Sequence, residues 1–172
     1  MSPLVLTVTG RDRPGVVAAV AKILFENGCN VTESSMTQLC GTVVMMLVLD
    51  APEPATPASL EEAFAPMAAE LEMQVSIWEL PRKTTQARPT HVLTVHGQDE
   101  SGILHRITHS LSGLGINITD LNSRVLGGIH GQRYALMLEL EVPEGLRPQM
   151  IEKIGDLVGV QLSVRPLDDE VP

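Results

Sequence analysis

The chain alternates between short apolar runs, as in strands, and apolar residues spaced three and four apart, as on one face of a helix. In the first half, strands are predicted at residues 4–9, 31–39, 43–49 and 74–79. Two helical stripes lie between them, at Val16, Val17, Val20 and Leu24 and at Leu60, Phe64, Met67 and Leu71. The predicted order is strand, helix, strand, strand, helix, strand.

The second half of the chain repeats the first. A shift of 87 residues aligns residues 4–32 with residues 91–119, and 11 of the 29 aligned pairs are identical. Two copies of one unit of about 80 residues indicate paired domains. We predict domains at residues 1–80 and 90–172, joined by a polar linker at residues 81–89. The second unit has helical stripes at Ile103, Leu104, Ile107 and Leu111 and at Leu146, Met150, Ile154 and Val158, and a last strand at residues 160–165.

This order predicts an α+β fold with two ferredoxin-like βαββαβ units in tandem, each an antiparallel sheet with both helices on one face. Residues 43–49 lack polar alternation, so we expect both faces of that strand to be buried, with the second unit or another chain as the cover. Residues 134–142 place Glu139 and Glu141 on one face, which should be partly solvated. Four extra residues in the second hairpin, within residues 126–132, predict a longer and more flexible tip.

Composition and charge exclude several classes of protein. The net charge is −9 and aromatic residues make up 2% of the chain, so we expect no direct binding to nucleic acid or to an anionic membrane. No apolar run approaches the roughly 20 residues that span a bilayer, and no leader precedes the first strand, which favours the cytoplasm. Cys29 and Cys40 bracket a predicted strand and would lie about 30 Å apart, too far to pair within one chain.

The corner between the first strand and the first helix occurs twice, as "TGRDRPGVV" at residues 9–17 and "HGQDESGIL" at residues 96–104. The first amides of a helix lack partners within it, and the positive end of its dipole lies there. We predict that Asp12 and Asp99 accept hydrogen bonds from these amides as N-caps. Gly15 and Gly102 would let another group approach the backbone closely.

Asn30 and Asn117 follow the glycine that ends the first helix of each unit, and we place them beside the same end of the sheet as the corner. The helix end would hold a carboxylate, while the aspartate and the asparagine would take an ammonium and the remaining hydrogen bonds. Together these groups fit a free amino acid. The alternative, that the corner is only a well-made helix start, remains open.

Other chemistry has weaker support in the sequence. Gly10 and Gly15 have the spacing of a phosphate-binding loop, but Val16 and Val17 stand where lysine and a hydroxyl residue are required. His105 and His109 could share a metal ion, yet no third ligand is placed by spacing, so no metal site is expected. No nucleophile and base recur in both copies, so we expect neither catalytic residues, an enzyme nor a cofactor.

The segment "GRDRPGVVAAVAKILFENGCNV" resembles the start of an ACT domain, and two such units with nothing else resemble the glycine cleavage system transcriptional repressor family. The resemblance implies a dimer that binds a small amino acid, glycine or similar, between two units and acts through a protein partner such as a DNA-binding regulator. A detached regulatory subunit of an amino-acid or one-carbon enzyme, or a protein-interaction scaffold, is the alternative. The implied ligand-binding residues are Gly10, Asp12, Gly15, Val16 and Asn30, and Gly97, Asp99, Gly102, Ile103 and Asn117.

Overall fold

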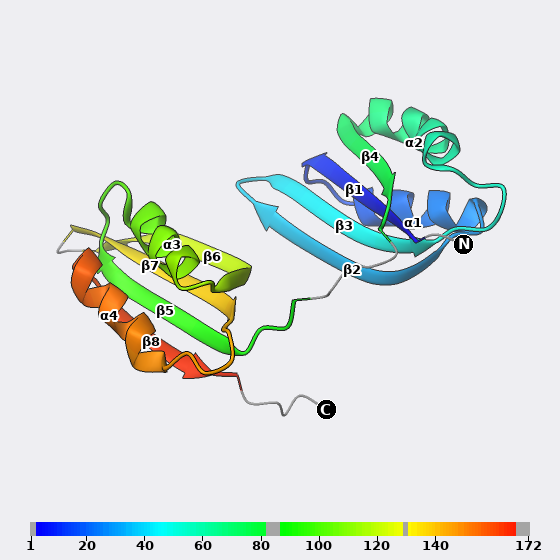
Figure 1. The fold of residues 1–172 in the computed structure, drawn as a ribbon. Coiled ribbons are helices and arrows are strands. Elements are labelled where there is room, and N and C mark those ends of the chain that lie inside the picture. The colour runs from blue at the N-terminus through cyan, green and yellow to red at the C-terminus, as the bar shows by residue number, and fades with distance from the viewer. Residues whose placement is uncertain (1–2, 82–86, 129–130, 168–172) are drawn as a thin grey trace. The chain divides into compact units, whose positions relative to one another are not determined.

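The computed structural model describes residues 3–81, 87–128 and 131–167. The chain divides into two compact units, residues 1–84 and 85–172, each with its own sheet and helices (Figure 1). The finer division, with a linker at residues 81–89, stays a prediction because residues 82–86 lie outside the described part.

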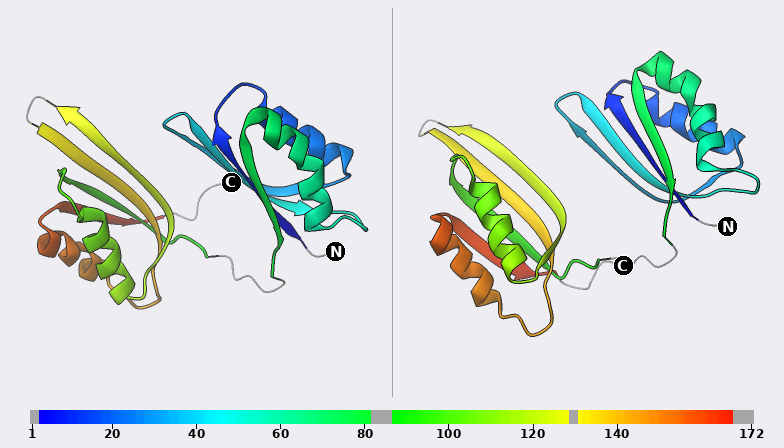
Figure 2. Two further views of the ribbon diagram at one scale, coloured as in Figure 1. Left: turned by 90° about the horizontal axis from the view of Figure 1, so that it is seen from above. Right: turned by 45° about the horizontal axis from the view of Figure 1, so that its top comes forward.

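Each unit has the element order βαββαβ, and its sheet is antiparallel. The strand orders are β2-β3-β1-β4 and β6-β7-β5-β8, and both helices of a unit lie on one face of its sheet (Figure 2). The predicted fold class is therefore confirmed. The first unit consists of β1 (Leu4–Arg11), α1 (Val16–Glu26), β2 (Asn30–Leu39), β3 (Thr42–Asp50), α2 (Pro57–Leu71) and β4 (Met73–Glu79); the second of β5 (His91–Gln98), α3 (Ile103–Gly113), β6 (Asn117–Gly128), β7 (Gly131–Glu141), α4 (Pro148–Val158) and β8 (Gln161–Pro166).

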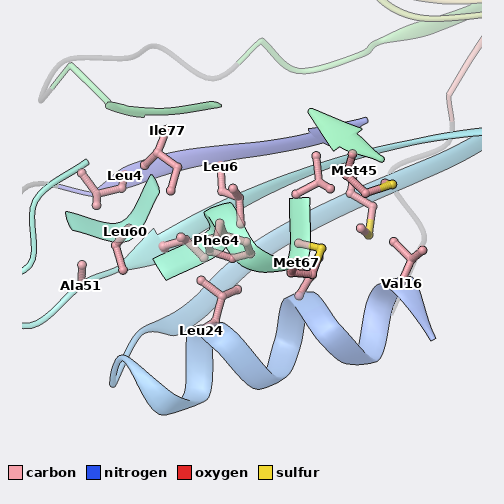
Figure 3. Close-up of a cluster of buried hydrophobic side chains, with 14 of the residues drawn as sticks. Leu4, Leu6, Val16, Leu24, Met45, Ala51, Leu60, Phe64, Met67 and Ile77 are labelled. Carbon is pink, nitrogen blue, oxygen red and sulfur yellow. The ribbon is translucent and has the colours of Figure 1, made fainter. Parts of the chain in front are cut away.

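An aliphatic core fills the space between sheet and helices in the first unit (Figure 3). Alternate residues of β1 and β3 point into it, because successive side chains of a strand lie on opposite faces. Phe64 on α2 is fully buried at the centre of the cluster. The other buried members are Leu4, Leu6, Val8, Val16, Val20, Leu24, Val43, Met45, Leu49, Ala51, Leu60, Met67, Met73 and Ile77.

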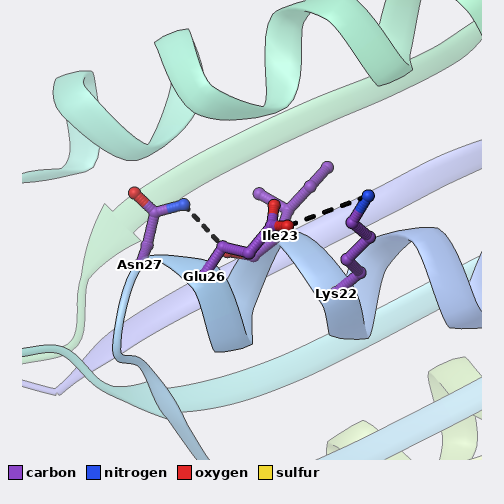
Figure 4. A network of polar contacts seen from close by, with 4 residues as sticks. All are labelled: Lys22, Ile23, Glu26 and Asn27. Atoms are coloured by element: carbon purple, nitrogen blue, oxygen red, sulfur yellow. Dashed lines mark hydrogen bonds and ion pairs between the residues drawn. The ribbon is translucent and has the colours of Figure 1, made fainter.

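The helix ends of the first unit follow sequence signals. Asn27 donates from Nδ2 to the carbonyl oxygen of Ile23 at 2.8 Å, and Nζ of Lys22 lies 3.8 Å from Oε1 of Glu26 (Figure 4). Gly28 follows in the left-handed region, with φ of 68°, and so ends α1 as the sequence predicts. These contacts turn the chain from α1 into the edge strand β2.

Helix α2 begins with a capping box. The Thr56 hydroxyl accepts from the Ser59 amide at 3.2 Å, and the Ser59 hydroxyl accepts from the Thr56 amide at 2.9 Å. Replacement Thr56→Ala should therefore lower the unfolding free energy of the first unit by about 0.5–2 kcal/mol. Urea unfolding followed by the fluorescence of Trp78, the single tryptophan of the chain, measures this directly. Thr56→Ser keeps the hydroxyl and should unfold at the wild-type midpoint; equal midpoints for all three proteins would contradict the assignment.

Strand β3 buries only one of its faces within the first unit. Val43, Met45 and Leu49 are in the core, whereas Val44 is 41% exposed and Met46 is 50% exposed. The two helices of the unit cover the same side of the sheet, so the other face of β3 has no cover within the unit, and the expectation that the second unit or another chain covers it stays a prediction. In the second unit, Leu138 is buried and Glu139 is partly exposed, as the alternation of β7 predicts.

Two details of the second unit differ from the expectations. The four extra residues lengthen the strands, since β6 has 12 residues against 10 in β2, and β7 has 11 against 9 in β3. The ladder continues to the pair Gly128 and Gly131, so the hairpin is longer through its strands, and the predicted flexible tip at residues 129–130 lies outside the described residues. In α4, Met150 is 45% exposed and Ile151 is buried, so Ile151 takes the inward position that the sequence pattern predicted for Met150.

Candidate functional site

The corner of each unit is shaped by a glycine in the left-handed region. Gly15 has φ of 97° and Gly102 has φ of 87°, and each is the N-cap of its helix without a side-chain hydrogen bond to the helix. The prediction that Asp12 and Asp99 are N-caps is therefore wrong. Each aspartate lies three residues before the cap, too early in the chain to occupy that position.

Asp12 instead ties the corner to the neighbouring hairpin. Its backbone amide donates to the carbonyl oxygen of Gly41 at 2.8 Å, in the turn between β2 and β3. The side chain of Asp12 is exposed. The carboxylate is therefore available to solvent or to a ligand, while the backbone of the same residue fixes the position of the loop.

The first turns of α1 and α3 keep free donors. Among the described residues, the amides of Val17 and Ala18 have no backbone acceptor, and neither do those of Leu104 and His105. A Cβ atom built on Gly15 or on Gly102 would meet nothing within 4 Å. The space in front of both helix ends is open, and the amides together with the helix dipole favour a negatively charged group there.

Two pairs of the predicted ligand-binding residues also take part in packing, and their contact with a ligand stays a prediction. Gly10 and Gly97 do not open the corner: a Cβ on Gly10 would lie 3.0 Å from the carbonyl oxygen of Glu72, and one on Gly97 would lie 3.0 Å from Val160 Cγ1. The start of the last strand of each unit, β4 or β8, lies beside this glycine. Val16 and Ile103 are 2% and 3% exposed and point into the two cores. Their side chains therefore cannot line a site in front of the helices.

The two asparagines lie at the other end of the sheets. Asn30 is paired with Asp50 on β3, whereas Gly10 is paired with Val43, seven residues away along the same strand. At roughly 3.3 Å per residue, this separates Asn30 from the corner of its own unit by about 23 Å. The prediction that both lie beside the same end is wrong, because α1 carries the chain back along the sheet before β2 begins.

The second unit repeats this separation. Asn117 is paired with Glu141, seven residues along β7 from Tyr134, the partner of Gly97. Its Nδ2 donates to Oε2 of Glu141 at 3.4 Å. The corner and the asparagine of one unit therefore cannot contact the same small molecule, and a site with both requires a corner from one unit and an asparagine from another.

The two corners differ in charge. Arg11 and Arg13 flank Asp12 in the first unit, whereas Gln98 and Glu100 flank Asp99 in the second. Arg106 lies 3.7 Å from Glu100 and offsets part of the negative charge. The first corner is therefore the better electrostatic environment for a carboxylate.

The remaining titratable groups add no second site. The rings of His105 and His109 are stacked with centroids 5.8 Å apart, but no group of three His, Cys, Asp or Glu side chains that could hold a metal occurs in the described part of the chain. Burial raises the pKa of the Cys29 thiol, so this residue is a protonated, partly buried side chain packed against the core.

A shallow groove on the helix-free face of the second sheet was not found from the sequence. It has a volume of about 310 Å³ and is lined by residues of β5, β6 and β7, among them His96, Arg124, Leu126 and Met137. The alternation of β7 could have indicated an open face, but the groove also depends on the pairing of strands distant in sequence. His96, the first residue of the second corner, lines this groove, whereas Asp99 and Gly102 do not.

Comparisons with known proteins show similarity to one family over the first unit. Residues 2–77 match the ACT domain family. The chain is 29% identical over 126 residues to the glycine cleavage system transcriptional repressor of Escherichia coli, a match that covers 70% of the chain and 64% of that protein. A UPF0237 protein of Methanocaldococcus jannaschii is 38% identical over 50 residues, which cover 29% of the chain and 56% of that protein. The chain thus spans less than two thirds of the length of these relatives.

Solved structures share the fold over nearly the whole chain. A protein of unknown function from Galdieria sulphuraria has a TM-score of 0.80 and 22% identity, covering 97% of this chain and 99% of that one. A protein assigned as a glycine cleavage system transcriptional repressor has a TM-score of 0.73 and 16% identity, covering 98% of both chains. At these identities the likeness establishes a common fold.

The first unit of the chain therefore matches the ACT domain family, and the chain holds two units of the same βαββαβ fold in tandem. The chain is similar in sequence to the glycine cleavage system transcriptional repressors of Escherichia coli and Shigella flexneri. Of the residues that the structure describes, none forms a helix long and apolar enough to cross a membrane.

Proposed function

We propose that this chain is a non-enzymatic regulatory protein of the cytoplasm that binds a small free amino acid, glycine or a similar one, and passes the signal to a protein partner. The observation that carries the proposal is the corner itself. An ACT domain match covers it, its helix amides lack acceptors, and a left-handed glycine leaves the space before them open.

The site would be composite. Because Asn30 lies about 23 Å from the corner of its own unit by its strand register, the ligand would contact the corner of one unit and the first residue of β2 or β6 of another. The carboxylate of the ligand would face the amides of Val17 and Ala18. Its ammonium would lie between the Asp12 carboxylate and the amide oxygen of the asparagine.

The charges favour the first corner as the principal carboxylate site. Arg11 and Arg13 add positive charge beside the helix end, whereas Glu100 adds negative charge beside the corresponding end of α3. We therefore expect one dominant class of site that contains Asp12, with weaker binding at the corner that contains Asp99.

The partner would be a protein and not DNA. The net charge of −9 opposes binding to a phosphate backbone. The similarity to a transcriptional repressor of the glycine cleavage system supports a DNA-binding regulator as the partner.

A thermal-shift panel of free amino acids tests the proposal. A ligand at about 100 times its dissociation constant adds roughly 2.7 kcal/mol to the stability of the folded state, which is several degrees for domains of this size. Loss of one hydrogen bond in Asn30→Ala should weaken binding by about 1–3 kcal/mol. Asn117→Ala should weaken binding in a different class of site from Asn30→Ala, and the variant with the larger effect identifies the asparagine that faces the Asp12 corner.

Ser34→Ala is the matched control. Ser34 is exposed near the middle of the same strand as Asn30 and far from both of its ends, so the variant should bind like the wild-type protein. If no amino acid shifts the melting curve, or if both asparagine variants respond like Ser34→Ala, the corner is only a helix start and the ligand-binding function is wrong.

A further inference from the structure

The helix-free face of the first sheet, which we call the open face, is uncharged over β1, β3 and β4. On the edge strand β2 it carries the exposed Glu33, which is paired with Val48 and lies toward the Asp50 end of the face. Every second residue of β1, β3 and β4 points into the core, so the residues between them point to the open face. Residues that are paired side by side across neighbouring strands form a row. In the three rows that contain Val5, Thr7 and Thr9, all nine described residues of β1, β3 and β4 on the open face are uncharged: Val5, Thr7, Thr9, Val44, Met46, Val48, Gln74, Ser76 and Trp78.

Large apolar side chains are exposed on this face. Val44 is 41%, Met46 50% and Trp78 42% exposed, and the three lie on neighbouring rows of one sheet. Val5, between Val48 and Trp78 in the ladder, is only 4% exposed. Tryptophan and methionine are enriched at protein interfaces, and a tryptophan is often a residue on which binding depends. The face has the composition of an interface centre.

Opposite charges lie at the two ends of the open face. Arg11 is exposed on β1 and is paired with Thr42, while Asp50 is exposed at the far end of β3. Met46 is four residues from Thr42 and four from Asp50. A two-fold axis that runs between two copies of the sheet, across the strands at Met46, would place Asp50 of each copy above Thr42 of the other, beside its neighbour Arg11.

The open face of the second unit does not offer the same surface. At the positions that correspond in the strand ladders, Glu139 replaces Val48, Arg165 replaces Trp78 and His96 replaces Thr9. Burial of such charges against Val44 and Met46 would leave them without water or a partner, which is costly. The surface that matches the open face of the first sheet is therefore another copy of that face.

We propose that two copies of this chain dimerise through the open faces of their first sheets, with the strands antiparallel across a two-fold axis at Met46. The contact is isologous, since the same patch serves both copies. Stacked sheets lie about 10 Å apart, close enough for the long side chain of Arg11 to reach the partner copy's carboxylates. This dimer does not depend on amino-acid binding, so its test is separate from that of the proposed function.

The repeat supplies a matched pair of variants. Met46→Glu places a charge at the centre of the proposed interface, and Met137→Glu places the same charge at the corresponding position of the second unit. Both methionines are partly exposed, so both variants should fold, which far-UV circular dichroism checks. Sedimentation equilibrium of the wild-type chain should give twice its mass of 18.6 kDa. The dimer dissociation constant should rise at least about 30-fold in Met46→Glu and stay unchanged in Met137→Glu.

Charge exchange tests the antiparallel arrangement. Arg11→Glu and Asp50→Arg should each weaken the dimer, and the double variant should restore it, because the exchanged charges meet across the axis. Dilution to monomer should also shift the emission of Trp78 to longer wavelength, as its ring becomes exposed to water. Val44→Lys should dissociate the dimer as Met46→Glu does.

Each other outcome overturns the proposal. A wild-type monomer whose Trp78 emission does not respond to Met46→Glu means that the face stays open. A monomer whose Trp78 emission shifts to longer wavelength in Met46→Glu means that the second unit of the same chain covers the face. A dimer that survives both Met46→Glu and Val44→Lys uses another surface.

Discussion

Phe64→Ala should lower the unfolding free energy of the first unit by about 3–5 kcal/mol, the largest effect expected of any single change discussed for this chain. Phe64 is 0% exposed and lies between α2 and the sheet, in a core that otherwise consists of aliphatic side chains. Truncation removes the whole phenyl ring and leaves a cavity that the neighbouring side chains cannot fully fill. An 80-residue unit has a total stability of only about 4–12 kcal/mol, so this is a large share.

The two units give this experiment an internal control. Trp78 on β4 reports the first unit, and Tyr134 on β7, the single tyrosine of the chain, reports the second. Urea unfolding of Phe64→Ala should move the transition seen by Trp78 to lower urea and leave that seen by Tyr134 in place. Phe64→Leu retains most of the volume and should lose less. An unchanged Trp78 midpoint in Phe64→Ala would show that the ring contributes little to the core.

Gly10→Ala should destabilise the first unit by about 1–3 kcal/mol, as expected when an atom is forced into a packed region. The new Cβ would lie 2.5 Å from Met73 Sδ and 3.0 Å from the carbonyl oxygen of Glu72. The methionine side chain can move away, but the backbone carbonyl at the start of β4 cannot. Gly97→Ala should cost less, because its close neighbour is a side-chain carbon of Val160.

The same variant separates packing from ligand binding. If Gly10 is a packing residue, Gly10→Ala lowers the Trp78 midpoint and keeps the thermal response to the amino acid at saturating concentration. If it is needed for close approach of a ligand, the midpoint stays and the response is lost. Gly15→Ala is the comparison: nothing lies within 4 Å of its Cβ, so any loss of stability reflects its φ of 97° alone.

Local patterns in the sequence were sufficient for the elements and most of the core. Strands, helices and the positions of Leu60, Phe64 and Met67 follow from alternation and from steps of three and four. The error at Met150 arose because Leu146 lies before the first residue of α4, so its spacing of four to Met150 is not helical, and Ile151 with Ile154 and Val158 forms the buried stripe. The added residues of the second hairpin were assigned to its tip for a different reason, since added residues can extend a ladder as well as a loop.

The candidate site was harder to predict because its parts are distant in space. The corner residues were found together since they are adjacent in sequence, and Gly15 and Gly102 do shape the two helix starts. The position of Asn30 depends on the direction in which α1 runs along the sheet, which decides at which end of the sheet β2 begins. A short sequence motif gives no information about that direction. Position 10 favours glycine because Glu72 and Met73, more than 60 residues away in the chain, lie where a Cβ atom would be.

The two corners retain one backbone shape while their side chains have diverged. Gly15 and Gly102 hold nearly the same angles, although arginines surround the first and acidic or polar residues the second. After a gene duplication, the scaffold of a ligand site can thus be inherited intact while selection on its charges is relaxed in one copy. The second unit could then drift toward a different ligand, or toward none, without any loss of foldability.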